Sequence, residues 1–204
     1  MYNRNIDIGI FNNFRPIPDL YVLQPGVNKM SLQKLLNDII NKEGGFVDNP
    51  NDKGGPTKYG ITIAALNKYT RGHNGKQDIQ AITREVAKKI YADNYYDKPG
   101  IYLLPGAIQP IIFDAAVNHG PQAAIQMLQA QLLADGYPGG KIDGIIGYMT
   151  VRAAEKASSE LGKTFINNLV SRRIAKYRKI IEHDPTQAVF EKGWITRAES
   201  FSIA

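Results

Sequence analysis

With 204 residues, 43% of them apolar and 22% charged, the chain has the size and composition of a soluble globular protein with one domain, or a catalytic domain with a smaller lobe. The net charge of +6 suits a polyanionic partner such as nucleic acid, an anionic membrane or an acidic cell wall, although many small proteins are basic without one. Because the chain has no cysteine, disulfides, a cysteine nucleophile and thiolate-bound zinc are excluded.

Residues 1–29 are expected to form an extended arm that lies against the folded body or docks on a partner. Prolines and a glycine interrupt the segment, and no helical period survives in it. It also lacks the continuous apolar stretch of a signal peptide. No apolar run elsewhere approaches the roughly 18 residues that span a bilayer, so no transmembrane segment is expected.

A helix is predicted over residues 31–42, with Ser31 as its N-cap and Gly44-Gly45 at its end. Its apolar residues recur at the spacing of one helix face: Leu32, Leu35, Leu36, Ile39 and Ile40. Residues 46–61 are rich in Gly, Asn, Asp and Pro, which predicts a loop or a short hairpin. Thr62 is then placed to cap a short helix.

Residues 70–77 have the composition of a polar loop, and the remainder of the chain is predicted to be helical. Apolar residues on one face predict helices at about residues 83–94 and 163–182, and an apolar run with little polar face predicts a buried helix at 107–119. Further helices are expected at about residues 122–134 and 150–159. A turn-rich connection precedes the second of these. The tail beyond Pro185 contains the only tryptophan, Trp194, which is expected to pin the tail onto the helices. The fold class is therefore mainly α, with at most a small β-hairpin.

Two carboxylates bracket the predicted hairpin loop. Glu43 falls on the apolar face of the first helix, where partial burial raises the pKa of a carboxyl and lets it hold a proton near neutral pH. Asp52 follows after eight residues, in a loop whose glycines allow it to return across a cleft. A protonated acid facing an ionised carboxylate is what glycoside cleavage requires. Asp48 is a rival for the second role, and Thr57 is placed to hold a water or a sugar hydroxyl.

The same residues also have a purely structural interpretation. Glu43 could lie exposed where the helix frays, although the helix dipole makes an anion an unfavourable choice there. The residues around Asp52 are ordinary turn formers, and Thr57 is an ordinary strand residue. Composition alone therefore leaves both interpretations open.

The segment Glu43-Gly44-Gly45-Phe46, followed by Asp52-x-Gly-Gly-x-Thr57-x-x-Gly-Ile-Thr62, resembles the signature of the glycoside hydrolase family 108 muramidases. These are phage endolysins and related bacterial peptidoglycan hydrolases. The order Glu, eight residues, Asp, four residues, Thr also resembles the catalytic triad of phage-type lysozymes. In those lysozymes the last gap is usually one residue longer, which leaves Thr62 as an alternative to Thr57.

Further segments extend the resemblance to about residues 31–200. Residues 83–91 with Tyr95-Tyr96 are similar to the helix that closes the catalytic region of the family. Residues 114–120, Leu128-Gln129 and Asp143-Gly144-x-x-Gly147-x-x-Thr150 resemble its C-terminal, peptidoglycan-binding segment. We accordingly expect an arm at residues 1–29, a catalytic region at 30–115 and a helical C-terminal region at 116–204 that packs with it as one body.

The resemblance implies a lysozyme-like helical fold and cleavage of the β-1,4 bond between N-acetylmuramic acid and N-acetylglucosamine. Glu43 would donate the proton, Asp52 would stabilise the oxocarbenium-like transition state or activate water, and Thr57 would position that water. Candidate contacts to the sugars combine polar side chains with aromatic rings: Asp48, Tyr59, Thr62, Tyr95 and Asn118.

The implied partner is bacterial peptidoglycan, and the arm is a candidate contact to other virion proteins. A phage enzyme without a signal peptide would wait in the host cytoplasm for release to the wall, or would be carried in the virion. No cofactor is implied. No metal site is expected either, because the histidines are scattered without ligand spacing: His73, His119 and His183.

Three other functions remain open at this point. The chain could be a non-enzymatic wall-binding or virion structural protein that kept the fold. It could be a transglycosylase, which also uses one Glu but leaves a 1,6-anhydro end. A nucleic-acid-binding role has only the basic pI of about 9.4 in its favour, since base-stacking and phosphate-cradling motifs are missing.

Overall fold

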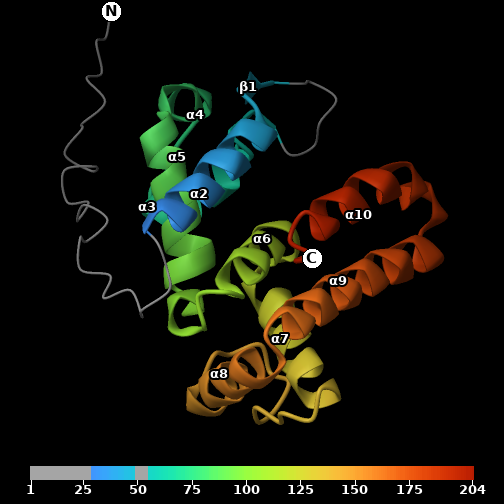
Figure 1. Cartoon of the computed structure of the whole chain (residues 1–204). Helices are drawn as coiled ribbons and strands as arrows, with labels where there is room; N and C mark the ends of the chain where they lie inside the picture. Colours follow the sequence, from blue (N-terminus) through green and yellow to red (C-terminus); the bar gives the residue numbers. More distant parts are fainter. Residues whose placement is uncertain (1–28, 49–54) are drawn as a thin grey trace, which may run out of the picture. The chain divides into compact units, whose positions relative to one another are not determined.

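The computed structural model describes residues 29–48 and 55–204, except for the side chains of residues 29–31, 42 and 43. The expected arm and Asp52 therefore lie outside the described residues. The described chain divides into two compact units, of which residues 36–90 form the first and residues 29–35 with 91–204 the second. Figure 1 shows the chain coloured along its sequence, with residues 1–28 and 49–54 as a thin grey trace.

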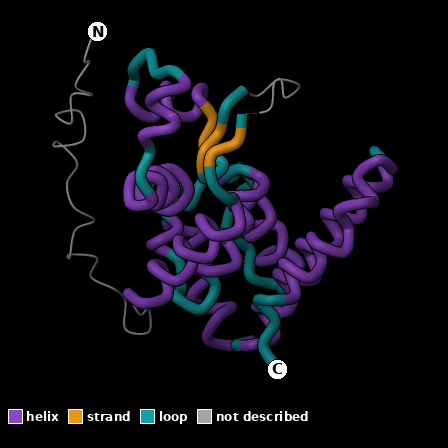
Figure 2. Tube along the Cα trace, turned by 90° about the horizontal axis from the view of Figure 1, so that it is seen from above, coloured by secondary structure: helices purple, strands orange, loops and turns teal. Residues whose placement is uncertain are grey.

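The first unit combines short helices with a small sheet. In chain order the elements are α2 (Lys29–Glu43), whose first turns belong to the second unit, β1 (Phe46–Val47), β2 (Thr57–Lys58), β3 (Ile61–Thr62), α3 (Ile63–Thr70), α4 (Lys76–Ala81) and α5 (Arg84–Ala92). The strands form one antiparallel sheet in the order β1-β2-β3, drawn in orange in Figure 2. The predicted helix over residues 31–42 is confirmed, but it begins at Lys29, so the prediction of Ser31 as its N-cap was wrong. The predicted hairpin gains a third strand.

Local sequence explains how α3 and α4 begin. The Thr62 hydroxyl accepts a hydrogen bond from the Ala65 amide at 3.1 Å, so the predicted N-cap is confirmed. The prediction of a polar loop over residues 70–77 was wrong at its end, because α4 begins at Lys76. The Asp78 carboxylate accepts from the Gly75 amide at 2.7 Å and holds this start. With a single buried residue, Ile79, so short a helix has no apolar period to reveal it.

The core of the first unit is made of aliphatic side chains from every helix and from β3. Its fully buried members include Leu36, Ile40, Ile61, Leu66, Ile79 and Ile82. Removing such a side chain from water stabilises the fold by about 1.5–3 kcal/mol, before conformational entropy is subtracted. This core therefore fixes the end of α2 and the sheet, which carry the candidate catalytic residues.

The second unit is almost entirely helical. It contains the π-helical turn η1 (Asp93–Asp97), the 3-10 turn η2 (Ile101–Leu103), α6 (Gln109–His119), α7 (Pro121–Ala134), α8 (Tyr148–Leu161), α9 (Lys163–His183), the 3-10 helix η3 (Pro185–Phe190) and α10 (Glu191–Glu199). Helix α6 is buried along nearly its whole length and packs against α7 and α9. The four helices predicted over residues 107–119, 122–134, 150–159 and 163–182 are thus confirmed within a few residues, and the fold is mainly α as expected.

Two parts of the second unit differ from expectation. The helix predicted over residues 83–94 continues beyond Ala92 as the π-helical turn η1, which contains Tyr95 and Tyr96. The tail beyond Pro185 is folded into η3 and α10, and α10 lies beside α9 (Figure 1). Trp194 pins this tail as predicted, because its ring stacks on that of Tyr177 in α9 with centroids 5.2 Å apart.

Within the part of the chain that the structure describes, none of the helices combines the length and the apolar character that a membrane crossing requires.

Candidate active site

The end of α2 and the three-stranded sheet form the frame of the candidate active site in the first unit. Helix α2 ends at Glu43, and Gly44, with a φ of +77°, turns the chain into β1. Residues 48–56 then connect β1 to β2, whose facing ends are Val47 and Thr57. Asp52 belongs to this connection. Its position and the side chain of Glu43 fall outside the described residues, so both catalytic assignments stay predictions.

A capping hydrogen bond distinguishes the two candidate threonines, which the sheet places side by side. Thr57 and Thr62 are opposite each other in the β2–β3 pair, and residues opposite each other in a sheet project from the same face. The Thr62 hydroxyl is already engaged as the N-cap of α3. Thr57 has no capping role, so it is the better placed of the two to position a water.

The turn between β2 and β3 holds Tyr59 in an uncommon backbone conformation. Tyr59 and Gly60 have φ values of +52° and +71°, as in a two-residue hairpin turn. The left-handed conformation costs a residue with a β-carbon roughly 1–2 kcal/mol. Lys58 fixes the turn, because its Nζ donates to the Gln80 carbonyl at 2.6 Å and lies 5.6 Å from the centroid of the Tyr59 ring. Strain of this kind is often retained at functional sites, which supports Tyr59 as a sugar contact.

We expect Tyr59→Asn to stabilise the protein and to weaken substrate binding. Asparagine tolerates the left-handed conformation, so the free energy of unfolding should rise by about 0.5–1 kcal/mol. Loss of the ring should raise KM if the ring stacks on a sugar. Denaturant unfolding and initial-rate kinetics on cell-wall fragments measure the two effects.

The matched control is Tyr59→Phe, which keeps both the ring and the strained β-carbon and should unfold like the parent. A Tyr59→Asn variant that is less stable than the parent would show that ring packing outweighs backbone strain at this turn.

Asp48 has a structural partner. Its carboxylate forms an ion pair with the Lys76 ammonium at the first residue of α4. This pair ties the exit of β1 to α4 within the first unit. Asp48 is therefore less suited than Asp52 to be the second catalytic carboxylate, and it stays a candidate sugar contact.

Tyr95 and Asn118, the other predicted sugar contacts, belong to the second unit. The Tyr95 ring packs against that of Tyr91, with centroids 5.6 Å apart. The neighbouring Tyr96 is buried, and its hydroxyl donates to Gln109 Oε1 at 2.6 Å; burial, followed by the nearby Asp97, raises the pKa of Tyr96 to about 12. Tyr96 is therefore a core residue. Asn118 donates from Nδ2 to the Asp114 carbonyl at 2.7 Å, which orients its amide at the end of α6.

A buried ion cluster at the centre of the second unit was missed by the sequence analysis. The Asp114 carboxylate of α6 accepts from Arg173 Nη2 at 2.5 Å and from Arg197 Nη2 at 2.9 Å. Arg173 is completely buried. Burial alone would raise the pKa of Asp114, but hydrogen bonds and charge from the two guanidinium groups outweigh it and hold this pKa below its ordinary value. The carboxylate is therefore ionised and anchors α6, α9 and α10 to one another.

His119, at the end of α6, lies beside this cluster. Its ring centroid is 5.2 Å from that of Tyr177, and its Nε2 is buried without a hydrogen-bond partner among the described residues. Burial, followed by the positive charges of Lys176 and Arg173, lowers the pKa of His119 to about 4, and the opposing effect of Asp114 is smaller. His119 is therefore neutral at pH 7, which suits packing better than catalysis.

His119 should make the protein sensitive to mild acid. An unfolded histidine has a pKa of about 6.5. The unfolded chain therefore binds more protons than the folded chain between that value and the folded pKa of about 4. Above about pH 6.5 the free energy of unfolding does not depend on the protonation of His119. It should fall by about 1–2 kcal/mol as the pH drops toward 4, less than the whole pKa shift implies, because solvent partly screens the half-buried ring. In His119→Gln this loss should be absent from denaturant unfolding measured at several pH values.

The matched control is His183→Gln, which removes an exposed histidine at the end of α9. If the free energy of unfolding of His119→Gln falls with pH as steeply as that of the parent, His119 is not the source of the acid sensitivity.

No group of three or more His, Asp or Glu side chains is arranged for metal binding among the described residues.

Comparison with known proteins adds to this geometry. A family model described as "Glycosyl hydrolase 108" matches residues 36–120, and one described as "Predicted Peptidoglycan domain" matches residues 123–199. The solved structure of SagA from Brucella abortus is 32% identical over 85% of this chain and 92% of that chain, with a TM-score of 0.68. The comparison with curated proteins found no match. The expected mainly α, lysozyme-like fold is confirmed.

The two matched segments do not coincide with the two compact units. Residues 91–120 belong to the first matched segment but fold with the second unit. Asp114 comes from the first segment, whereas Arg173 and Arg197 come from the second. The ion cluster thus joins the two matched segments within one unit.

Proposed function

The chain belongs to the glycosyl hydrolase 108 family, and we propose on that premise that it is an N-acetylmuramidase that cleaves peptidoglycan between N-acetylmuramic acid and N-acetylglucosamine. Membership confirms the resemblance drawn from the sequence and makes the chain a peptidoglycan hydrolase. The observation that carries the proposal is the succession of the two matched segments, one hydrolytic and one associated with peptidoglycan, in a single chain.

In the proposed mechanism, Glu43 protonates the glycosidic oxygen as the bond to the departing sugar breaks. Glu43 is the last residue of α2. At this end of the helix the negative pole of the dipole favours the protonated form of a carboxyl. Asp52 stays ionised, and it either stabilises the positive charge that develops on the sugar ring or activates the attacking water. Thr57, on the strand that follows the Asp52 loop, positions that water.

Analysis of the products tests the proposed bond. Purified peptidoglycan is incubated with the protein, and the released fragments are examined by reducing-end assay and mass spectrometry. A muramidase leaves reducing N-acetylmuramic acid ends. Fragments with 1,6-anhydro ends would instead show a transglycosylase, and sedimentation with the wall without any release would show a binding protein.

The route by which the enzyme reaches the wall stays a prediction. An enzyme that is transported within a virion is found in purified virus particles, whereas one that is released from the host cytoplasm is not. Immunodetection in purified particles would distinguish the two routes.

A further inference from the structure

The connection between α7 and α8, together with the first turn of α8, carries a group of exposed apolar side chains. Four of them fall within residues 142–149, and their exposed fractions run from 45% to 76%: Ile142, Ile145, Tyr148 and Met149. Tyr148, at the first position of α8, is the most exposed of the four at 76%. Apolar side chains gathered in this way on a protein surface usually mark a site of interaction.

One buried glutamine, Gln129, holds the backbone of residues 142–149 in place through hydrogen bonds. Gln129 Nε2 donates to Asp143 Oδ1 and to the Ile145 carbonyl, both at 3.0 Å, and its Oε1 accepts from the Gly144 amide at 2.9 Å. A β-carbon on Gly144 would lie 2.5 Å from Gln122 Cγ, and the φ of this glycine is +80°. The segment is thus held in one conformation, so a ligand would bind to it without the entropic cost of ordering it.

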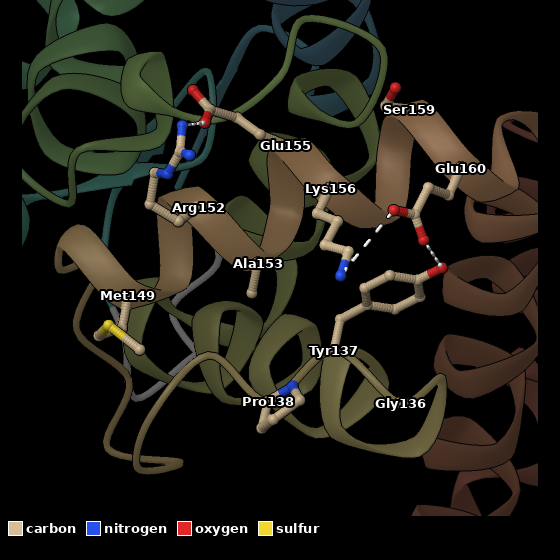
Figure 3. A pocket seen from close by; sticks show the side chains of 10 residues that line it. All are labelled: Gly136, Tyr137, Pro138, Met149, Arg152, Ala153, Glu155, Lys156, Ser159 and Glu160. Atoms are coloured by element: carbon tan, nitrogen blue, oxygen red, sulfur yellow. Dashed lines mark hydrogen bonds and ion pairs between the residues drawn. The ribbon is translucent and has the colours of Figure 1, made fainter.

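A groove of about 620 Å³ adjoins this segment and shares Met149 with it (Figure 3). Its walls are α8 and residues 136–138. Charges of both signs line it as two pairs on α8, Arg152 with Glu155 at 3.0 Å and Lys156 with Glu160 at 3.9 Å. The Tyr137 ring forms part of the opposite wall, and its hydroxyl donates to Glu160 at 2.8 Å.

We propose that residues 142–149 and the adjoining groove form the surface through which the second unit holds the peptidoglycan strand. The apolar face of a sugar stacks on the Tyr148 ring, and the stem peptide lies in the groove beside Lys156. Stem peptides carry carboxylates and ammonium groups, which complement the mixed charges of Arg152, Lys156, Glu155 and Glu160. An anionic membrane suits this surface less well, because acidic side chains alternate with the basic ones along the groove. The choice of ligand rests on the proposed function.

Co-sedimentation of the full chain with insoluble purified peptidoglycan tests the proposal. Tyr148→Ala should weaken binding about tenfold, since a stacked aromatic side chain commonly contributes that much. The matched control is Val189→Ala in η3, another apolar residue that is 80% exposed, and it should bind like the parent. The thermal unfolding midpoint of Tyr148→Ala should equal that of the parent, because a side chain that is 76% exposed contributes little to packing.

A second variant separates sugar from peptide contacts. Lys156→Ala should weaken binding to intact peptidoglycan severalfold but not to glycan strands stripped of their peptides by an amidase. Tyr148→Ala should weaken binding to both. Parental affinity of Tyr148→Ala for intact peptidoglycan, no binding by the parent, or a defect of Tyr148→Ala confined to anionic phospholipid vesicles or to self-association would each overturn the proposal.

The two proposals fail separately. A chain that binds through Tyr148 but releases no reducing ends contradicts the proposed hydrolase and leaves the binding surface standing. A chain that hydrolyses peptidoglycan while Tyr148→Ala binds like the parent contradicts only the binding surface.

Discussion

A Glu43→Gln variant is expected to fold like the parent and to release reducing ends from peptidoglycan at least about a thousandfold more slowly. Glutamine keeps the size and hydrogen-bonding ability of the side chain but has no proton to give to the departing oxygen. A positioned general acid contributes about 10²–10⁴-fold to a rate, and cleavage of an unactivated glycosidic bond depends heavily on it. Rates are measured on purified peptidoglycan, with circular dichroism as the check on folding.

A matched substitution in the same unit is available for comparison. Glu85 lies at the start of α5, is exposed and pairs with Lys88 at 2.8 Å, so Glu85→Gln should keep the parental rate. Asp52→Asn should also slow the reaction strongly, because it removes the anion that opposes the oxocarbenium charge. Parental activity in Glu43→Gln would remove Glu43 from the mechanism, whatever the family relation implies.

The sequence predicted the elements whose apolar residues repeat over several turns. Helices α2 and α9 have such repeats, α6 is a nearly continuous apolar run, and the positions of all three were found within a few residues. Helix α4 has one buried residue and α10 likewise has one, Ala198, so neither shows a period. Gly193 within α10 also weakens any helical signal there. Tertiary packing, here through Trp194, decides such segments instead.

The candidate site could be predicted from the sequence only where its residues are neighbours in the chain. Glu43, Thr57 and Thr62 fall within one short stretch, and a motif can therefore relate them. The left-handed conformation of Tyr59 could not be predicted, because Asn-Gly is typical of this hairpin turn and Tyr-Gly is not. The partners of Asp114 are 59 and 83 residues away in the chain, and no local pattern connects them.

The Asp114→Asn variant is expected to lose about 3–5 kcal/mol of unfolding free energy. Removing one member of a buried ion cluster leaves its partners charged and without compensation, which costs that much. Here two guanidinium groups depend on one carboxylate, and Arg173 is completely buried. Denaturant unfolding followed by the fluorescence of Trp194, the only tryptophan and part of α10, reports on this unit directly.

Comparison of single and double variants shows whether charge or packing causes the loss of unfolding free energy in Asp114→Asn. Arg197→Met should cost less than Asp114→Asn, because Asp114 then keeps Arg173 and the buried charges balance. Combining Asp114→Asn with Arg197→Met should cost less than the sum of the two, since one unpaired cation is gone. Asp184→Asn, at an exposed cap of η3, is the control and should cost about 1 kcal/mol or less. Strict additivity would mean that the cluster contributes through shape alone. Coupling would show that residues 91–120 depend for their stability on the segment that follows them.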